Sequence, residues 1–159
     1  MTVAFIGSND FKRAVPTTVK MWNELTKLVT DEGADVFLFT NEGLFDNSCW
    51  QVVTQLQTQH PNIKRIYAQT GYEDNRGELQ ELEKCYEEII LLNSLCENKV
   101  LAPFARNRFM VLMSDVLVTY FDDTNLRMPR IASSTEEAIQ FANRYKKRII
   151  NLCKLKYTF

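Results

Sequence analysis

The sequence predicts an α/β fold, a Rossmann-like three-layer sandwich whose mostly parallel sheet has helices on both faces. Two observations support this prediction. Short, continuous apolar runs, typical of strands buried on both faces, alternate along the chain with longer segments whose apolar residues recur at helical spacing. Strands that alternate with helices form mostly parallel sheets, because each helix carries the chain back to the starting edge. The 159 residues show no repeat, linker or low-complexity segment, which predicts a single domain over residues 1–159.

Five apolar runs are the expected strands. The first, Val3–Ile6, ends at Gly7 and is expected at the centre of the sheet. The other four follow in chain order: Val36–Phe39, Ile63–Ala68, Val116–Phe121 and Arg148–Leu152. A further short strand is expected in "KVLAP", residues 99–103.

The expected helices fill the spaces between these runs, where apolar residues recur every three to four positions. In chain order they lie at residues 16–32, 45–56, 79–92 and 104–115, and from residue 133 to the last strand. The last of them begins at "SST", where hydroxyl side chains precede the apolar periodicity.

The overall charge argues against two classes of partner. The formal net charge is −1, and the sequence has no basic stripe with interleaved aromatic residues. Neither a nucleic acid nor a membrane surface is therefore an expected partner. The N-terminal apolar run, Val3–Ile6, is too short for a signal peptide or a membrane span, so the expected location is cytoplasmic.

The cysteine and histidine content predicts no metal centre. None of the four cysteines forms a C-x-x-C pair, and the chain has one histidine, His60, so neither a metal nor a cofactor is expected. The cysteines lie on or beside apolar helix faces, or at the end of a strand, as expected of buried free thiols in a reducing compartment. They are Cys49, Cys85, Cys96 and Cys153.

Candidate ligand-binding residues follow from the fold class. In doubly wound sheets, ligands bind at the carboxyl ends of the strands, near the point where strand order reverses. Three segments are expected to converge there: the turn after the first strand, the turn after the second strand, and the start of the last helix. Their candidate residues are Gly7, Ser8 and Asn9; Thr40, Asn41, Glu42, Gly43 and Asp46; and Ser133, Ser134 and Thr135.

The same segments resemble the SLOG superfamily, named for the Smf/DprA and "Lonely guy" proteins, and in particular its small bacterial and phage YpsA-like branch. "TVAFIGSND" is similar to the first strand and loop of that branch, "TNEGLFD" to its glycine-rich turn, and "SST" to the S-G-T before its last helix. "RNRFM" resembles a helical R-N-x-x-M motif, which adds Arg106 and Asn107 to the candidate ligand-binding residues. The resemblance covers nearly the whole chain and implies a SLOG-like Rossmann domain that binds a nucleotide or a related molecule.

Several positions depart from the family pattern. Glu42 lies in the turn where the family has paired glycines, and a carboxylate there repels phosphate unless the ligand presents a hydroxyl or a ring nitrogen. Ser134 replaces the glycine of S-G-T, and the Gly-His-Arg after the first strand has become Gly-Ser-Asn. These departures predict a rebuilt site, suited to a small or singly phosphorylated ligand rather than to a dinucleotide.

Each candidate also has a purely structural interpretation. Ser134, with a glutamate three residues later, matches a capping box. Arg106 and Asn107 fit a solvated helix start, and Asp46 fits a first-turn acid favoured by the helix dipole. Glu42 and Asp46 together can also be interpreted as a carboxylate pair for glycosidic chemistry.

Two main classes of function stay open. The favoured interpretation is a non-catalytic binding module for a nucleotide or nucleotide-derived small molecule, with no catalytic residue. The alternative is an N-glycosidic enzyme, because the "Lonely guy" phosphoribohydrolases and the similar nucleoside deoxyribosyltransferases use a carboxylate three residues after the threonine of G-T-x-x-E. The corresponding residue here is Ala138, which argues against catalysis. A third interpretation, a DNA-binding protein similar to DprA, is disfavoured by the near-neutral charge. A structural or interaction role is a further one, and Trp22, Trp50 and Tyr72 would support a homodimer if they are exposed.

Overall fold

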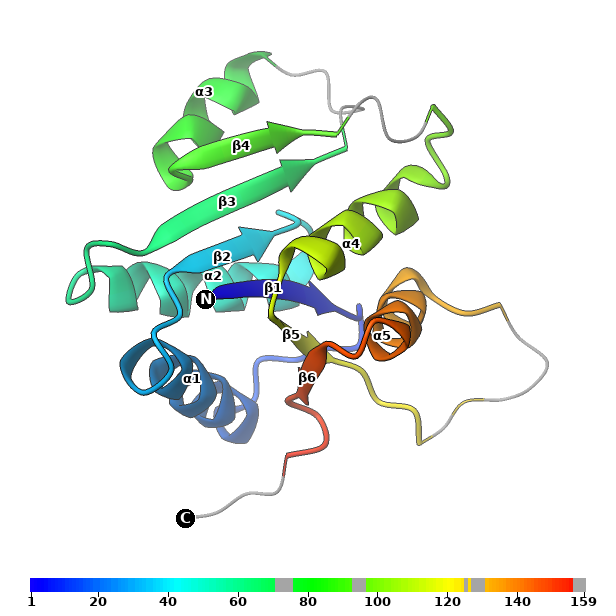
Figure 1. Cartoon of the computed structure of the whole chain (residues 1–159), viewed down its shortest axis with the longest axis horizontal. Coiled ribbons are helices and arrows are strands. Elements are labelled where there is room, and N and C mark those ends of the chain that lie inside the picture. The colour runs from blue at the N-terminus through cyan, green and yellow to red at the C-terminus, as the bar shows by residue number, and fades with distance from the viewer. Residues whose placement is uncertain (71–75, 93–96, 125, 127–130, 156–159) are drawn as a thin grey trace.

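The computed structural model describes residues 1–70, 76–92, 97–124, 126 and 131–155. These residues form a six-stranded, all-parallel sheet in the order β4-β3-β2-β1-β5-β6 (Figure 1). The strands are β1 Thr2–Gly7, β2 Val36–Phe39, β3 Lys64–Gln69, β4 Glu88–Leu91, β5 Val116–Tyr120 and β6 Arg148–Asn151. The helices are α1 Val15–Thr30, α2 Gly43–Gln57, α3 Arg76–Cys85, α4 Ala102–Met113 and α5 Ser134–Arg144. The predicted α/β fold class is confirmed, and the first strand is central, between β2 and β5.

Helices bury both faces of the sheet, which is why the central strands have continuous apolar sequences. One core cluster joins Val3 and Phe5 of β1 to buried side chains of α1 and α2. The other joins Ala4 and Ile6 to buried side chains of α4 and α5. Successive residues of β1 therefore serve opposite faces, as the twofold periodicity of a strand requires.

Two expected elements are wrong, while the five expected strands agree with the structure to within one residue at each end. The long helix predicted through residue 92 ends at Cys85, and Glu88–Leu91 forms strand β4 beside β3. Residues 99–101, expected within a strand, form a turn that leads directly into α4. Because β4 is an edge strand with both of its ends exposed, its sequence lacks the continuous apolar run of a central strand.

Strand order reverses between β1 and β5. Strands β2, β3 and β4 extend from one side of β1, while β5 and β6 extend from the other. The segments that follow β1 and β5 therefore leave in opposite directions, and a crevice opens between them at the carboxyl ends of the strands.

The described cysteines are all free thiols. Cys49 is buried, Cys85 and Cys153 are partly buried, and Cys96 lies outside the described residues. None of these sulfurs lines the crevice at the point of strand reversal.

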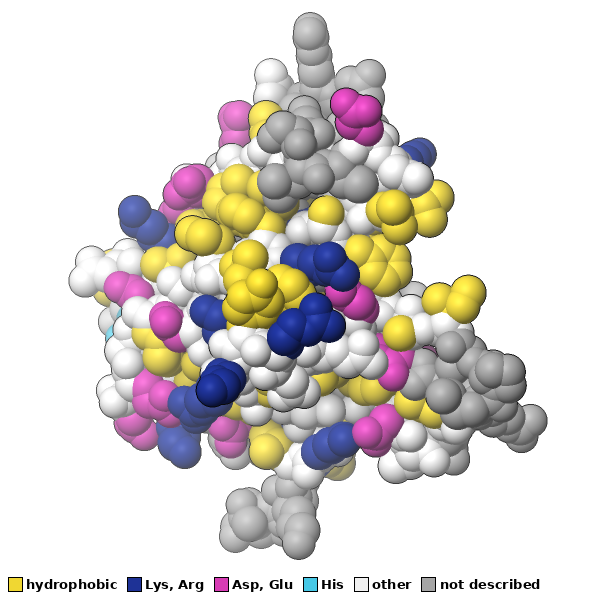
Figure 2. Space-filling model, turned by 45° about the vertical axis from the view of Figure 1, so that its right-hand side comes forward, with side chains coloured by type: hydrophobic (Ala, Val, Ile, Leu, Met, Phe, Trp, Pro, Cys, Tyr) yellow, Lys and Arg dark blue, Asp and Glu magenta, His cyan; other side chains and the backbone are white. Residues whose placement is uncertain are grey.

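The surface offers no single dominant feature on the face shown in Figure 2, where basic and acidic side chains are interspersed. Trp22 and Trp50 both pack partly against the core, and Tyr72 lies outside the described residues, so the homodimer stays a prediction. None of the described helices is both long and apolar enough to cross a membrane.

Candidate functional site

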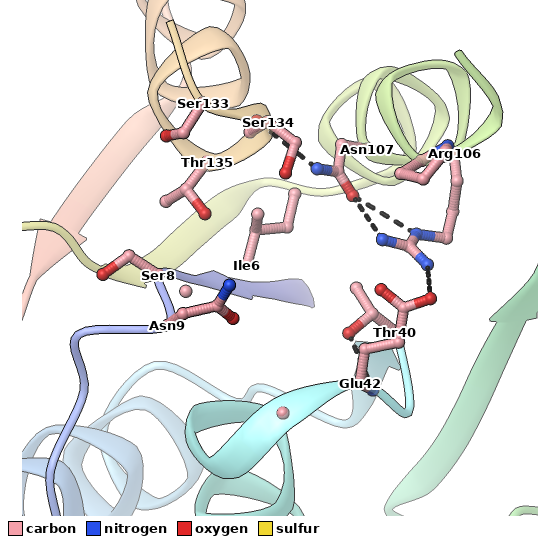
Figure 3. Close-up of a pocket in the computed structure, with 13 residues that line it drawn as sticks. Ile6, Ser8, Asn9, Thr40, Glu42, Arg106, Asn107, Ser133, Ser134 and Thr135 are labelled. Atoms are coloured by element: carbon pink, nitrogen blue, oxygen red, sulfur yellow. Dashed lines mark hydrogen bonds and ion pairs between the residues drawn. The ribbon is translucent and has the colours of Figure 1, made fainter. Parts of the chain in front are cut away.

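A cavity of about 260 Å³ lies at the point where strand order reverses (Figure 3). It is bounded by the end of β1, the turn after β2, the first turns of α4, and the start of α5. The residues that line it are Ile6, Gly7, Ser8, Asn9, Thr40, Glu42, Gly43, Pro103, Arg106, Asn107, Ser133, Ser134 and Thr135.

The structure brings together eleven of the thirteen candidate residues, and separates Asn41 and Asp46 from them. Two further lining residues, Ile6 and Pro103, were missed. Ile6 directly precedes Gly7, and Pro103 lies one helical turn before Arg106, so strand and helix geometry could have found both. Whether these residues bind a ligand stays a prediction.

The start of α5 both caps the helix and lines the cavity. The N-cap is Ser133, whose Oγ accepts a hydrogen bond of 3.2 Å from the Glu136 N–H. The N-cap is thus Ser133 rather than the Ser134 of the expected capping box, and Glu137 pairs instead with Arg108. The Ser134 and Thr135 hydroxyls point toward the cavity (Figure 3). This corner is thus a helix cap and a cavity wall at once.

The start of α2 forms the opposite wall. Gly43, the first residue of the helix, has a φ of 81°, a left-handed conformation that strains other L-residues. Glu42 occupies the N-cap position, and its side chain makes no capping hydrogen bond. The first N–H groups of a helix have no acceptor within it. The starts of α2 and α5 therefore both bring N–H groups and the positive end of a helix dipole to this cavity.

A buried arginine carries the positive charge of the site. Arg106 is 4% exposed, and its Nη1 lies 3.0 Å from Glu42 Oε1. Its Nε and Nη2 both donate to Asn107 Oδ1 at 3.3 Å, and Asn107 Nδ2 donates to the Ser134 carbonyl at 3.4 Å. The structure thus contradicts a solvated helix start, because both side chains belong to a polar chain that joins the starts of α2 and α5 (Figure 3).

Asp46 holds the turn after β2. Its Oδ1 accepts hydrogen bonds from the Thr40 N–H and hydroxyl, at 2.7 and 3.0 Å, and its Oδ2 accepts one from the Asn41 N–H at 3.1 Å. Burial raises the pKa of Asp46 to about 7, although these donors and the nearby Arg106 favour the ionised form. Asp46 therefore fixes the turn from which Glu42 and Gly43 extend to line the cavity of about 260 Å³, called the main cavity below.

The raised pKa of Asp46 predicts a stability that falls with pH. Between pH 3.8 and about 7 the folded protein keeps a proton that the unfolded chain has lost, so the free energy of unfolding decreases by about 1.4 kcal/mol per pH unit in that window. Above pH 7 the contribution levels off. From pH 6 to pH 8, urea denaturation should show wild type losing about 1.4 kcal/mol relative to Asp46→Asn. Equal slopes in the two proteins would show that Asp46 is already ionised at pH 6.

The residues at the positions that glycosidic chemistry requires either lack a carboxyl group or are already bonded to other groups. Ala138, at the place of the family carboxylate, is a fully buried residue of α5. Asp46 is engaged by three donors and faces away from the main cavity, and Glu42 is paired with Arg106. The two carboxyl groups thus do not flank one space as a glycosidase pair does.

Comparison with known proteins supports the fold and leaves the family open. No protein-family model matches the chain, and no curated protein matches it in sequence. The structure is similar to the Moco carrier protein of Chlamydomonas rheinhardtii, with a TM-score of 0.52 and 17% sequence identity. The match covers 96% of this chain and 75% of that chain. At this identity the likeness shows the Rossmann-like fold alone, with which the resemblance to the SLOG superfamily is compatible.

Proposed function

We propose that this chain is a non-catalytic binding module for a nucleotide or nucleotide-derived small molecule, whose phosphate occupies the cavity between α2 and α5. One observation carries the proposal: two helix N-termini and the buried guanidinium of Arg106 face the same cavity. Each feature alone is common in proteins, but together they place N–H donors and positive potential on opposite sides of one space.

The charge balance favours a ligand with one phosphate. Arg106 contributes one positive charge, and Glu42 offsets it at 3.0 Å. A ligand with two or three phosphates would bring several negative charges near Glu42, and among the described residues no second buried cation lines the cavity. The hydroxyls of Ser134 and Thr135 give a phosphate further hydrogen-bond donors.

The structural neighbour is compatible with this proposal. That protein is a Moco carrier protein, which is compatible with a module that binds a small molecule. We propose the same kind of role here, with the ligand chosen by the residues of this cavity rather than by analogy.

The proposal is tested by a thermal-shift panel of inorganic phosphate, ribose 5-phosphate, the four 5′-nucleoside monophosphates and a pyrophosphate-linked dinucleotide. The monophosphates should raise the melting temperature, since a ligand that binds only the folded state stabilises it. The dinucleotide should have a smaller effect. The proposal is wrong if no phosphorylated ligand raises the melting temperature. It is also wrong if a monophosphate releases free base and Glu42→Gln abolishes that turnover.

Substitutions of two neighbouring serines should change different quantities, the ligand affinity for Ser134 and the stability of the fold for Ser133. Ser134→Ala removes a hydroxyl from the cavity and should weaken monophosphate binding about fivefold, or about 1 kcal/mol, with little change in stability. Ser133→Ala removes the cap of α5 and should lower the free energy of unfolding by about 1 kcal/mol. Isothermal titration calorimetry and urea denaturation measure the two quantities. If both variants lose only stability, the corner is a helix cap and not a phosphate site.

A further inference from the structure

A second cavity, of about 210 Å³, lies between α2 and α3 on the other side of the first turn of α2. Gly43 lines both this cavity and the main one. The other lining residues are Asn41, Asp46, Asn47, Trp50, Leu82, Cys85 and Tyr86. The proposed function assigns no role to this space.

The walls of the second cavity include two aromatic rings whose polar atoms are already bonded. Trp50 Nε1 donates to the Cys85 carbonyl at 3.1 Å, and the Tyr86 hydroxyl donates to Asn41 Oδ1 at 3.1 Å. The two rings meet edge to face, with their centroids 6.5 Å apart. Arg65 lies against the Trp50 ring, with its guanidinium carbon 5.4 Å from the centroid. Because these contacts fix both rings, they can present flat apolar surface to a ligand without rearranging.

One side of the same cavity is polar. Asp46 Oδ1 accepts two hydrogen bonds, but Oδ2 accepts only one from the described residues, so the ionised carboxylate has a lone pair left for an N–H donor. The amide of Asn41 is held there by a backbone φ of 56°, a left-handed conformation that asparagine tolerates better than most residues. Aromatic walls beside a carboxyl and an amide match the chemistry of a ring that stacks and also donates hydrogen bonds.

We propose that this second cavity holds the heteroaromatic ring of the ligand whose phosphate occupies the main cavity, a ring that bears N–H or amino donors, as nucleobases do. The inference rests on the proposed function, because it requires that the phosphate of the same ligand occupy the main cavity, on the other side of Gly43. The first turn of α2 then separates the two halves of one ligand. The alternative is an unoccupied packing gap between α2 and α3.

Trp50 gives a direct signal for ring binding. The chain has two tryptophans, so Trp22→Phe leaves Trp50 as the only one, and a base that stacks in the second cavity should change its fluorescence. In this background, at least one of the four 5′-nucleoside monophosphates should change the emission on titration. Ribose 5-phosphate, which has the phosphate but no heteroaromatic ring, should raise the melting temperature and leave the emission unchanged.

A matched pair of substitutions on α2 locates the ring. Asn47 and Gln51 are both exposed and one helical turn apart, but only Asn47 lines the second cavity. Asn47→Phe should fill the cavity and weaken nucleoside monophosphate binding about tenfold, while ribose 5-phosphate binds as before. Gln51→Phe should change neither affinity.

The outcomes separate this inference from the function on which it rests. If ribose 5-phosphate and all four monophosphates bind equally well, and Asn47→Phe changes nothing, the phosphate site stands and the ring subsite is wrong. If none of the phosphorylated compounds binds, the proposed function fails and the ring subsite fails with it. Monophosphate binding that is tighter than that of ribose 5-phosphate but insensitive to Asn47→Phe also overturns the inference, because the ring then binds elsewhere.

Discussion

Gly7→Ala is expected to lower the free energy of unfolding by about 3 kcal/mol, the cost of strong overpacking in a closed core. Gly7 ends β1 against the ring of Phe45, the third residue of α2. A Cβ on Gly7 would overlap the ring carbons and lie 2.8 Å from Phe45 Cβ. Phe45 is buried and packs edge to face against Phe11, so it cannot swing aside cheaply. Urea denaturation of the variant measures the loss.

Two controls isolate the steric origin of this effect. Gly33→Ala places a methyl group in open space at a φ of 74°, so it should cost only about 1 kcal/mol of backbone strain. In a Phe45→Ala background the obstructing ring is gone and only the contact with the Cβ of residue 45 remains, so Gly7→Ala should cost clearly less than it does in wild type. The explanation is wrong if Gly7→Ala costs the same in both backgrounds.

Arg106→Gln is expected to weaken binding of a phosphorylated ligand about 100-fold, or about 3 kcal/mol, because it removes a buried cation that lines the main cavity. Isothermal titration calorimetry with ribose 5-phosphate measures the change. Arg108→Gln is the matched control, since Arg108 lies on the same helix but is half-exposed and pairs with Glu137. Its affinity should stay within about twofold of wild type.

Glu42→Gln is expected to act in the opposite direction. The carboxylate now occupies the side of Arg106 that a phosphate would use, so its neutralisation should strengthen binding several-fold. Weaker binding in Glu42→Gln would instead show that the carboxylate accepts a hydrogen bond from a ligand hydroxyl. If Arg106→Gln and Arg108→Gln bind ribose 5-phosphate equally well, the phosphate does not contact Arg106.

Much of the main cavity could be predicted from the sequence because parallel strands end at one edge. Gly7 and Gly43 follow two adjacent strands, and Ser134 follows the strand on the other side of β1, so their convergence needs only the topology. The pairing of Arg106 with Glu42 could not be predicted in the same way. It depends on how α4 rotates against the turn after β2, which no local sequence pattern specifies.

The second cavity could not be predicted from the sequence, because one of its walls depends on where α3 ends, and that helix was expected to be longer. A helix extended through residue 92 places Cys85 and Tyr86 in its interior, whereas α3 ends at Cys85 and the chain turns into β4. That ending frees the Cys85 carbonyl to accept from Trp50, and it brings Tyr86 to Asn41. The apolar residues of β4 continue the helical spacing of the preceding segment, and an edge strand with exposed ends lacks the long apolar run that marks a central strand.

Two sides of the main cavity should respond differently to salt and pH. Apolar packing between Gly7 and Phe45 holds one side, and an ion pair holds the other. Gly7 lines the cavity and packs against the buried side chain of Phe45, and neither salt nor pH alters such apolar packing appreciably. The wall depends on an ion pair whose carboxylate is half-exposed, so added salt screens it. A rise in ionic strength should therefore loosen Glu42 from Arg106 while the distance between the end of β1 and α2 stays fixed. Salt should thus alter how strongly Arg106 attracts a ligand while the backbone that frames the cavity stays in place.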